Sequence, residues 1–261
     1  MKVIVTTALR PSAKIMAMAQ NLAAILQIPY VVRENHSIPM LKEIYKTDLL
    51  LIITQRGPVV TTPGGNFFFH LSMAQLRIKN IINGKHDHMA AAMDLKPGMS
   101  VLDCTLGLAT DAIVASFVAG TTGYVKGIEN SPLISAVTRY GLQNFADADS
   151  DIIQSLRRVE VETADYLKYL NNLSTDSFDI VYFDPMFRRP IQSSSNVKPL
   201  RYLADDRPLL PEAVAEACRV AKRRVVIKEA HNSAEFRKFP LTALQGGKYS
   251  SIHYGIIEIS G

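Results

Sequence analysis

Four carboxylates follow apolar segments that have the length of buried strands. Asp103 follows MSVL, Glu129 follows YVKGI, Asp165 follows RRVEVETA and Asp184 follows FDIVYF. The carboxyl ends of parallel strands meet at one edge of a sheet, and ligands of open α/β sheets bind beyond that edge. The pattern therefore predicts one site in which these acidic side chains converge.

The first of these segments leads into a loop with a single glycine. VLDCTLGLATDA has only Gly107, whereas a dinucleotide-binding loop needs G-x-G-x-x-G so that a pyrophosphate can lie against bare backbone. The two acids of the loop, Asp103 and Asp111, would repel a diphosphate but suit a ligand with an ammonium group and a sulfonium charge. We therefore predict S-adenosylmethionine (SAM) as the cofactor and disfavour a nicotinamide dehydrogenase. The alternative is that Asp103 only ends a strand and Asp111 only caps a helix.

The next two junctions fit the adenosine part of that cofactor. Glu129 comes about twenty residues after the glycine, where a carboxylate can accept both ribose hydroxyls. Asp165 can accept a hydrogen bond from the adenine amine, and Tyr166 lies beside it in the sequence. Unrelated helix caps, which also favour the helix dipole, are the alternative explanation for this series of acids.

The fourth junction, Asp184-Pro185-Met186-Phe187, has the residue types that methylation of a base amine requires. An exocyclic amine is a poor nucleophile because the ring shares its lone pair, so it must be held in line with the leaving sulfur. The Asp184 carboxylate and the carbonyl after it can accept the two amine hydrogens and stabilise the developing positive charge, and Phe187 can stack on the base. We predict Asp184, Pro185 and Phe187 as catalytic residues. Otherwise Pro185 stops the strand, Asp184 caps the turn and Phe187 packs under the loop.

The loop beyond, RRPIQSSSNVKPLRYLADDR, is basic for most of its length. Arg188, Arg189, Lys198 and Arg201 are the predicted substrate-binding residues, because lysine and arginine side chains can clamp a phosphate backbone. A plain solvated loop is the alternative.

Other polar residues are weaker candidates. His86 and His88 have no third ligand nearby in the sequence, so we predict no metal site. His231 follows a predicted strand and could touch substrate at the same edge as Asp184. We expect Lys228, within VVIKEA, to extend out of the sheet toward solvent rather than to act as a base.

The elements that must position these residues alternate between strands and helices. Residues 1–65 are predicted to form a small α/β domain for substrate recognition, with strands at VIVTT, PYVVR, DLLLIITQ and VVTT. The turn sequence TTPGGN at 61–66 is the predicted boundary. Residues 66–261 continue the alternation, which indicates a mostly parallel sheet covered by helices on both faces. Ser12 and Ser131 are the expected N-caps of two of the helices.

The composition of the chain restricts the possible functions less than the motifs do. A net charge of +5 and a pI near 9.1 fit an acidic partner such as RNA without requiring one. Cys104 and Cys218 are expected to be small buried side chains in a reducing compartment. The N-terminus lacks the pattern of a secretory signal and no apolar run approaches a membrane span, so we expect a cytoplasmic protein that contacts no membrane.

The chain resembles the class I methyltransferases that modify the exocyclic amine of a guanine in bacterial small-subunit ribosomal RNA. The similarity lies in VLDCTLGLATDAIVAS, VYFDPMF, RRVVIKEAH and HYGIIEI and covers most of residues 70–261. It implies a Rossmann-like class I fold with a seven-stranded, mostly parallel sheet in residues 66–261, a ribosomal or other RNA as substrate, and a role in rRNA processing. It also implies cofactor contacts from Thr110 and Asp111, Glu129 and Asn130, Asp165 and Tyr166, and Asp184.

Residues 1–65 match that family poorly, as expected of a paralogous group with an added N-terminal unit. Two alternatives stay open. One is a SAM-dependent methyltransferase of a protein or small molecule, and the other is a non-catalytic RNA-binding protein that retains the fold. The sequence leaves the oligomeric state open.

Overall fold

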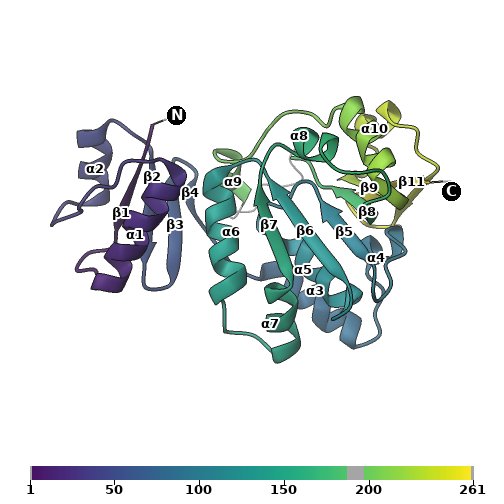
Figure 1. Ribbon diagram of the computed structural model, residues 1–261, viewed down its shortest axis with the longest axis horizontal. Coiled ribbons are helices and arrows are strands. Elements are labelled where there is room, and N and C mark those ends of the chain that lie inside the picture. Colours follow the sequence, from purple (N-terminus) through teal and green to yellow (C-terminus); the bar gives the residue numbers. More distant parts are fainter. Residues whose placement is uncertain (1, 187–196, 260–261) are drawn as a thin grey trace.

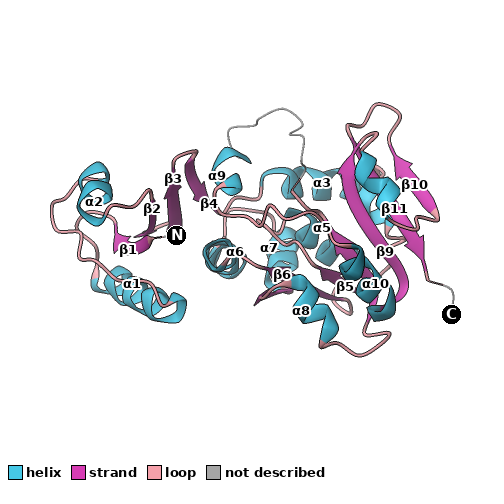
Figure 2. Ribbon diagram, turned by 90° about the horizontal axis from the view of Figure 1, so that it is seen from above, coloured by secondary structure: helices cyan, strands magenta, loops and turns pink. Residues whose placement is uncertain are grey.

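Two β-sheets organise the chain (Figure 1). The computed structural model describes residues 2–186 and 197–259. Within these residues the first sheet has four strands in the order β1-β2-β3-β4, and the second has seven in the order β10-β11-β9-β8-β5-β6-β7. The helices that cover the second sheet lie on both of its faces (Figure 2).

The first sheet is formed by the N-terminal quarter of the chain. Its elements are β1 (Val3–Thr7), α1 (Ala13–Leu26), α2 (Ile38–Tyr45), β2 (Leu49–Thr54), β3 (Gly57–Thr62) and β4 (Gly65–Phe68). The Ser12 hydroxyl caps α1 by accepting a hydrogen bond from the Ile15 amide, as predicted. The predicted strand PYVVR is wrong. Only Tyr30 forms an isolated bridge, to Val5, because the proline before it has no N–H to continue a ladder and the chain then turns away.

The turn TTPGGN joins two strands instead of two domains. It connects β3 to β4 in an antiparallel hairpin, so the first sheet continues past the predicted boundary to Phe68. Val5, Leu51 and Val60 of this sheet share a hydrophobic core with Leu133 and Val137 of α6 in the second unit. The N-terminal unit is therefore fastened to the larger one by apolar packing.

The second sheet confirms the predicted seven-stranded, mostly parallel architecture. Its strands are β5 (Ser100–Asp103), β6 (Tyr124–Glu129), β7 (Val159–Thr163), β8 (Phe178–Phe183), β9 (Ala221–Ala230), β10 (Ala243–Gly246) and β11 (Ile252–Glu258). Strands β5 to β9 pair in parallel, and β11 runs antiparallel between β9 and β10. The chain order reverses between β5 and β8, which is where an open sheet of this kind leaves a crevice for ligands.

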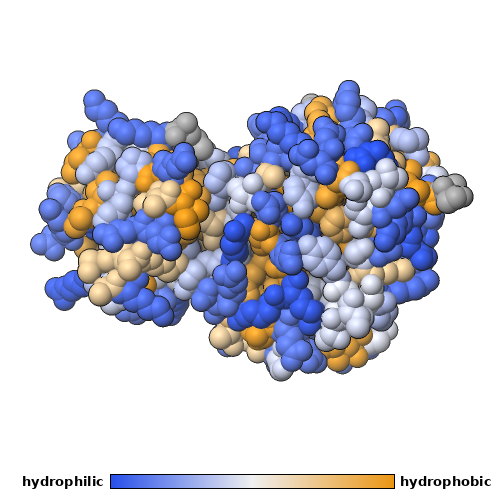
Figure 3. All heavy atoms as spheres, in the orientation of Figure 1, coloured by the Kyte–Doolittle hydropathy of each residue, from blue (hydrophilic) through white to orange (hydrophobic). Residues whose placement is uncertain are grey.

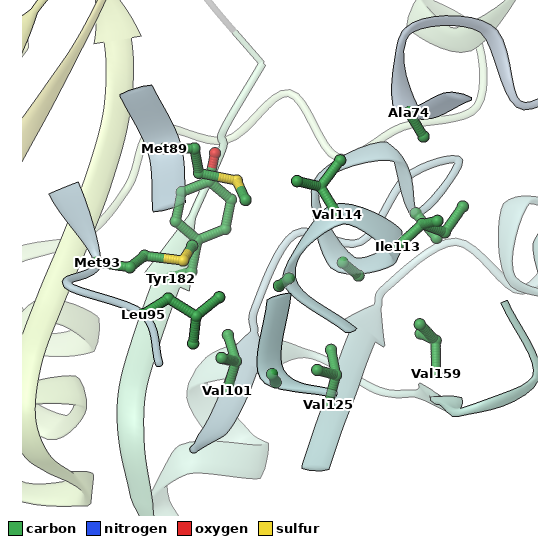
Figure 4. Close-up of a cluster of buried hydrophobic side chains, with 14 of the residues drawn as sticks. Ala74, Met89, Met93, Leu95, Val101, Ile113, Val114, Val125, Val159 and Tyr182 are labelled. Atoms are coloured by element: carbon green, nitrogen blue, oxygen red, sulfur yellow. The ribbon is translucent and has the colours of Figure 1, made fainter. Parts of the chain in front are cut away.

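Helices pack on both faces through separate cores. The helices of this unit are α3 (Ser72–Ile82), α4 (His88–Ala92), α5 (Thr110–Ala119), α6 (Pro132–Asn144), α7 (Ser150–Arg157), α8 (Tyr166–Asn171), α9 (Val197–Arg201), α10 (Pro211–Val220) and the 3₁₀ helix η1 (Ala234–Lys238). One core joins α3, α4, α5 and α7 to the sheet (Figure 4), and the other joins α8 and α10 to the opposite face. The Ser131 cap of α6 is confirmed, whereas α7 was not predicted.

The parallel strands place their carboxyl ends at one edge of the sheet. Asp103 ends β5, Glu129 ends β6 and Asp184 directly follows β8. In the part of the chain described, no helix has both the length and the apolar character needed to cross a membrane.

Candidate active site

A cavity of about 1140 Å³ lies along this edge of the sheet. It brings together most of the residues predicted from the sequence. Those that line it are Asp103, Gly107, Thr110, Asp111, Glu129, Asn130, Tyr166, Asp184, Pro185, Lys198 and Arg201. Asp165 is not among the lining residues, and the predicted Phe187, Arg188 and Arg189 lie outside the described residues.

The loop after β5 presents bare backbone to the cavity. Gly107 has a φ of 53°, and a Cβ added to it would meet no atom within 4 Å, so the space beside it is open. Its amide donates to the Glu129 Oε2 at 3.0 Å, and its carbonyl accepts from the Thr138 hydroxyl at 2.7 Å. The loop is thus held in place from behind and leaves its front face free for a ligand.

Glu129 is fixed at the end of β6. Its side chain is buried, and its Oε1 accepts from the Ser131 amide at 2.8 Å while Oε2 accepts from Gly107. Burial raises the pKa of Glu129, although these backbone hydrogen bonds oppose the shift. The remaining lone pairs of the carboxylate can accept the hydroxyls of a ribose.

Asp103 lies beneath the same loop and is 2% exposed. Its Oδ1 accepts from the Thr105 amide at 3.0 Å. Burial raises the pKa of Asp103 to about 8, against the effect of that hydrogen bond. A cation bound beside Asp103 would favour its ionised form.

A cluster of charged side chains, which was not predicted from the sequence, lies at the middle of the carboxyl edge of the second sheet. Asp111, at the start of α5, accepts hydrogen bonds from Arg77 of α3, from the Tyr182 hydroxyl at 2.8 Å and from the Lys228 Nζ at 2.9 Å. Arg77 also binds Asp87 through two hydrogen bonds of 2.8 and 2.9 Å. Burial alone would raise the pKa of Asp111, but the charges of Lys228 and Arg77 hold it well below its usual range. Asp111 is therefore ionised and serves first to hold its neighbours.

Asp184 completes this cluster on the cavity side. Its Oδ2 accepts from the Lys228 Nζ at 2.8 Å, and its amide donates to the Thr105 hydroxyl at 2.5 Å. Burial raises the pKa of Asp184 to about 6; the charge of Lys228 opposes this shift and that of Asp111 adds to it. The expectation that Lys228 extends to solvent is wrong. Its ammonium group points into the cavity because two carboxylates there compensate the cost of burying it.

Asp165 does not line the cavity but binds a residue that does. Its carboxylate caps α8 by accepting from the Lys168 amide at 3.0 Å and binds the Arg207 guanidinium at 2.7 Å. Arg207 also pairs with Asp205, which accepts from the Asn130 side chain at 3.1 Å, and Arg207 and Asp205 both line the cavity. The contact of Asp165 with adenine remains a prediction.

The histidines singled out in the sequence differ in their relation to the cavity. His86 and His88 line it, whereas His231 does not and instead meets His253 at 2.9 Å. Across the described ranges, no three His, Cys, Asp or Glu side chains form a group that could hold a metal ion.

The sequence carried a partial signal for the residues that were missed. Lys228 stands two positions after Val226, a core residue on the face that α5 covers, so period-2 alternation places its side chain on that same face. A lysine on a covered face needs a carboxylate partner. Arg77 gave no such signal in the sequence, because the residues of α3 do not indicate that this helix packs beside Asp111 of α5.

Comparisons with known proteins agree with this geometry. Residues 66–248 match the profile of the family described as "Putative SAM-dependent methyltransferase". The chain is 37% identical over 256 residues to the uncharacterized protein YpiP of Bacillus subtilis, which covers 98% of this chain and 99% of that protein. It is 30% identical over 219 residues to the ribosomal RNA small subunit methyltransferase J of Coxiella burnetii, which covers 80% of each. A crystal structure of a SAM-dependent methyltransferase from Neisseria gonorrhoeae shares the fold, with a TM-score of 0.66 at 16% identity over 99% of this chain and 96% of that chain.

Replacing Lys228 tests whether the ion cluster stabilises the fold. Lys228→Met roughly keeps the length of the side chain but removes the cation that binds Asp184. Asp111 then has Arg77 as its one remaining cation among the described residues. We expect the free energy of unfolding at neutral pH to fall by about 3 kcal/mol, as measured by urea denaturation.

Lys126→Met is the matched control. The two lysine side chains are 18% and 19% exposed and both lie on strands. Lys126, however, approaches the exposed Glu160 and Glu162 only at 3.9 Å each and lies over the Tyr169 ring, 5.5 Å from its centroid. Its replacement should cost less than about 1 kcal/mol. Equal losses in the two variants would contradict a special role for the cluster.

Proposed function

This chain belongs to the family of SAM-dependent methyltransferases, and we propose that it methylates an exocyclic amine of a base in RNA. The observation that carries the proposal is the position of Asp184. It stands at the end of β8 on the cavity wall, where one carboxylate oxygen binds Lys228 and the side chain is 28% exposed.

The residues at the β5 and β6 ends fit the cofactor. The open space beside Gly107 admits a ligand against the backbone, and the carboxylates of Asp103 and Glu129 suit a cationic nucleoside. Ile128, Tyr166 and Leu209 supply apolar wall for a purine ring. Bound SAM supplies an electrophilic methyl group on a sulfonium. We assign Thr110, Asn130 and Asp165 to the part of the cavity that binds the cofactor. Asp165 acts there through Arg207, which it binds.

The residues around Asp184 then act on the acceptor. The carboxylate oxygen that does not bind Lys228 accepts a hydrogen from the amine, which draws the nitrogen lone pair out of conjugation with the ring and toward the methyl group. The carbonyl of Pro185 can take the second hydrogen. As the nitrogen becomes positively charged, the fixed negative charge of Asp184 stabilises it, and the amine proton leaves to Asp184 or to water. Lys228 holds the carboxylate in place throughout.

RNA is favoured as the substrate by the distribution of charge. Residues 1–68 carry seven lysines and arginines against three acidic residues, so four of the five net positive charges belong to the first quarter of the chain. The β4 strand of this unit contacts α9, and a second hollow between them is lined by Pro63, Gly64, Lys198, Arg201 and Tyr202. Lys198 and Arg201 line both this hollow and the main cavity. Figure 3 shows the narrow waist between the two lobes that this junction bridges.

We therefore assign residues 1–68 and α9 to RNA binding. A chain that enters the waist can reach the cavity past two basic side chains and the exposed ring of Tyr202, which can stack on a base. The Coxiella burnetii relative is named for action on small-subunit ribosomal RNA, which makes that RNA the first substrate to examine.

Transfer of labelled methyl groups tests the function. Purified protein is incubated with methyl-labelled SAM and, separately, small ribosomal subunits, transfer RNA and total protein from a strain that lacks this gene. Label should enter RNA. Asp184→Asn should reduce the transfer about 100-fold, because it removes a charge aimed at the transition state, while the SAM dissociation constant changes little. Asp147→Asn, on an exposed loop, should transfer normally. Label that enters only protein would reject the proposal.

The pH dependence of transfer follows from the titration of Asp184. The ionised carboxylate accepts the amine hydrogen and the protonated one does not. With the pKa of Asp184 raised to about 6, kcat/KM should increase with pH through about 6 and then level off. Assays from about pH 5 to about pH 8 should show this limb in the wild type and lose it in Asp184→Asn. An unchanged limb in the variant would assign the titration to another group.

The salt dependence of RNA binding tests the role of α9. Lys198→Gln combined with Arg201→Gln should weaken binding of small-subunit RNA and reduce the slope of log affinity against log salt by about 1 to 2, since each lost phosphate contact releases fewer counterions. Lys79→Gln combined with Lys222→Gln removes the same charge from exposed positions outside the cavity lining. Equal slopes in the two double variants would argue against a specific site at α9.

A further inference from the structure

The cavity extends over both halves of the sheet. The strands follow the order β11-β9-β8-β5-β6-β7, and Asp184, at the end of β8, lies between the two halves of the cavity. Gly107 and Glu129 lie over β5 and β6 on one side, and Lys228 and Tyr254 come from β9 and β11 on the other. A methyl group passes in line between its leaving atom and its acceptor. With the nucleoside over β5 and β6, the acceptor must approach over β9 and β11.

Tyr254 is the residue that β11 contributes to this second half. It is the direct partner of Lys228 in the antiparallel ladder between β9 and β11, so the two side chains lie on the same face of the sheet. The Tyr254 side chain is 7% exposed and packs in the core with Tyr182 and Ile256, yet it lines the cavity. Its ring is therefore fixed, and its hydroxyl is next to the ion cluster.

The hydroxyl of Tyr254 has no hydrogen-bond partner among the residues the structure describes. The polar groups around it are paired. The Tyr182 hydroxyl binds Asp111, Lys228 binds both aspartates, and Arg77 binds Asp111 and Asp87. The Tyr254 hydroxyl is not one of the fully buried unpaired polar atoms of the described residues, so it is open to the cavity and can bond to a group that enters it. A ligand in the cavity could therefore accept a hydrogen bond from the Tyr254 hydroxyl.

The chemical role of this hydroxyl is that of a donor. Burial, reinforced by the charge of Asp111, raises the pKa of Tyr254, so the proton stays on the oxygen at neutral pH. Asp184 presents an acceptor on the same cavity. In adenine, cytosine and guanine, the carbon that bears the exocyclic amine also bears a ring nitrogen with a free lone pair. An acceptor for the amine beside a donor for that nitrogen matches the edge of such a base.

With the methyl-accepting base in the half of the cavity over β9 and β11, we propose that the Tyr254 hydroxyl donates a hydrogen bond to the ring nitrogen next to the reacting amine. This assignment rests on the proposed function. Tyr254 orients the base, and Asp184 acts on its amine.

Tyr254→Phe tests the assignment, because it removes the donor and keeps the ring. With methyl-labelled SAM and small ribosomal subunits from the strain that lacks this gene, kcat/KM for the RNA should fall about tenfold, as expected for one lost hydrogen bond. The SAM dissociation constant, measured by calorimetry, should stay within about twofold of the wild type, because the nucleoside contacts lie in the other half. The melting temperature should be equal or higher, since no bond within the protein is lost.

Two other tyrosines give matched controls. Tyr249→Phe changes a side chain that is 91% exposed and should leave all three measurements unchanged. Tyr182→Phe removes a bonded hydroxyl and should lower the melting temperature.

Three results would overturn the inference. They are wild-type transfer rates in Tyr254→Phe, a weakening of SAM binding as large as the loss of transfer, and a drop in melting temperature like that of Tyr182→Phe. A wild-type protein that labels no RNA would instead reject the proposed function, and this inference with it.

Discussion

The buried ion cluster around Lys228 is the interaction on which the site depends. Burying an ammonium group or a carboxylate is costly unless a partner of opposite charge meets it at close range. Lys228 on β9 meets this condition only because α5 brings Asp111 and β8 brings Asp184 to it, and Arg77 ties α3 to the same carboxylate. The cluster thus fixes how these elements meet at the carboxyl edge, and the shape of the cavity follows from that arrangement.

The same cluster gives neighbouring carboxylates different chemistry. Asp111 has two cations and stays ionised, whereas Asp103 has a pKa raised to about 8 by burial and Asp184 one of about 6. Asp184 is therefore poised to change its charge near neutral pH. A cation bound beside Asp103 would favour the ionised form of that carboxylate.

The N-terminal unit packs against the larger unit at two places. Its sheet shares a core with α6, and α6 begins at Pro132, three residues after Glu129, so the unit is anchored close to the end of β6. Its β3–β4 hairpin reaches α9 at the cavity mouth, and a Cβ at Gly64 would lie 2.9 Å from the Lys198 backbone. The close approach needs a glycine there. These two contacts fix the position of the N-terminal unit beside the cavity.

The amino-acid sequence by itself determined the alternation of strands and helices, the caps at Ser12 and Ser131, and the acids at successive strand ends, because these depend on periodicity and on neighbours a few residues away. It also placed Asp184 at the end of a buried strand. It did not determine that the turn at 61–66 closes a hairpin, that PYVVR lacks a strand partner, or that Lys228, Arg77 and Tyr254 face the cavity. Arg77 meets Asp111 across 34 positions and Lys228 meets it across 117. A local pattern can show which face a side chain occupies, but only the packed tertiary structure decides which charge lies opposite it.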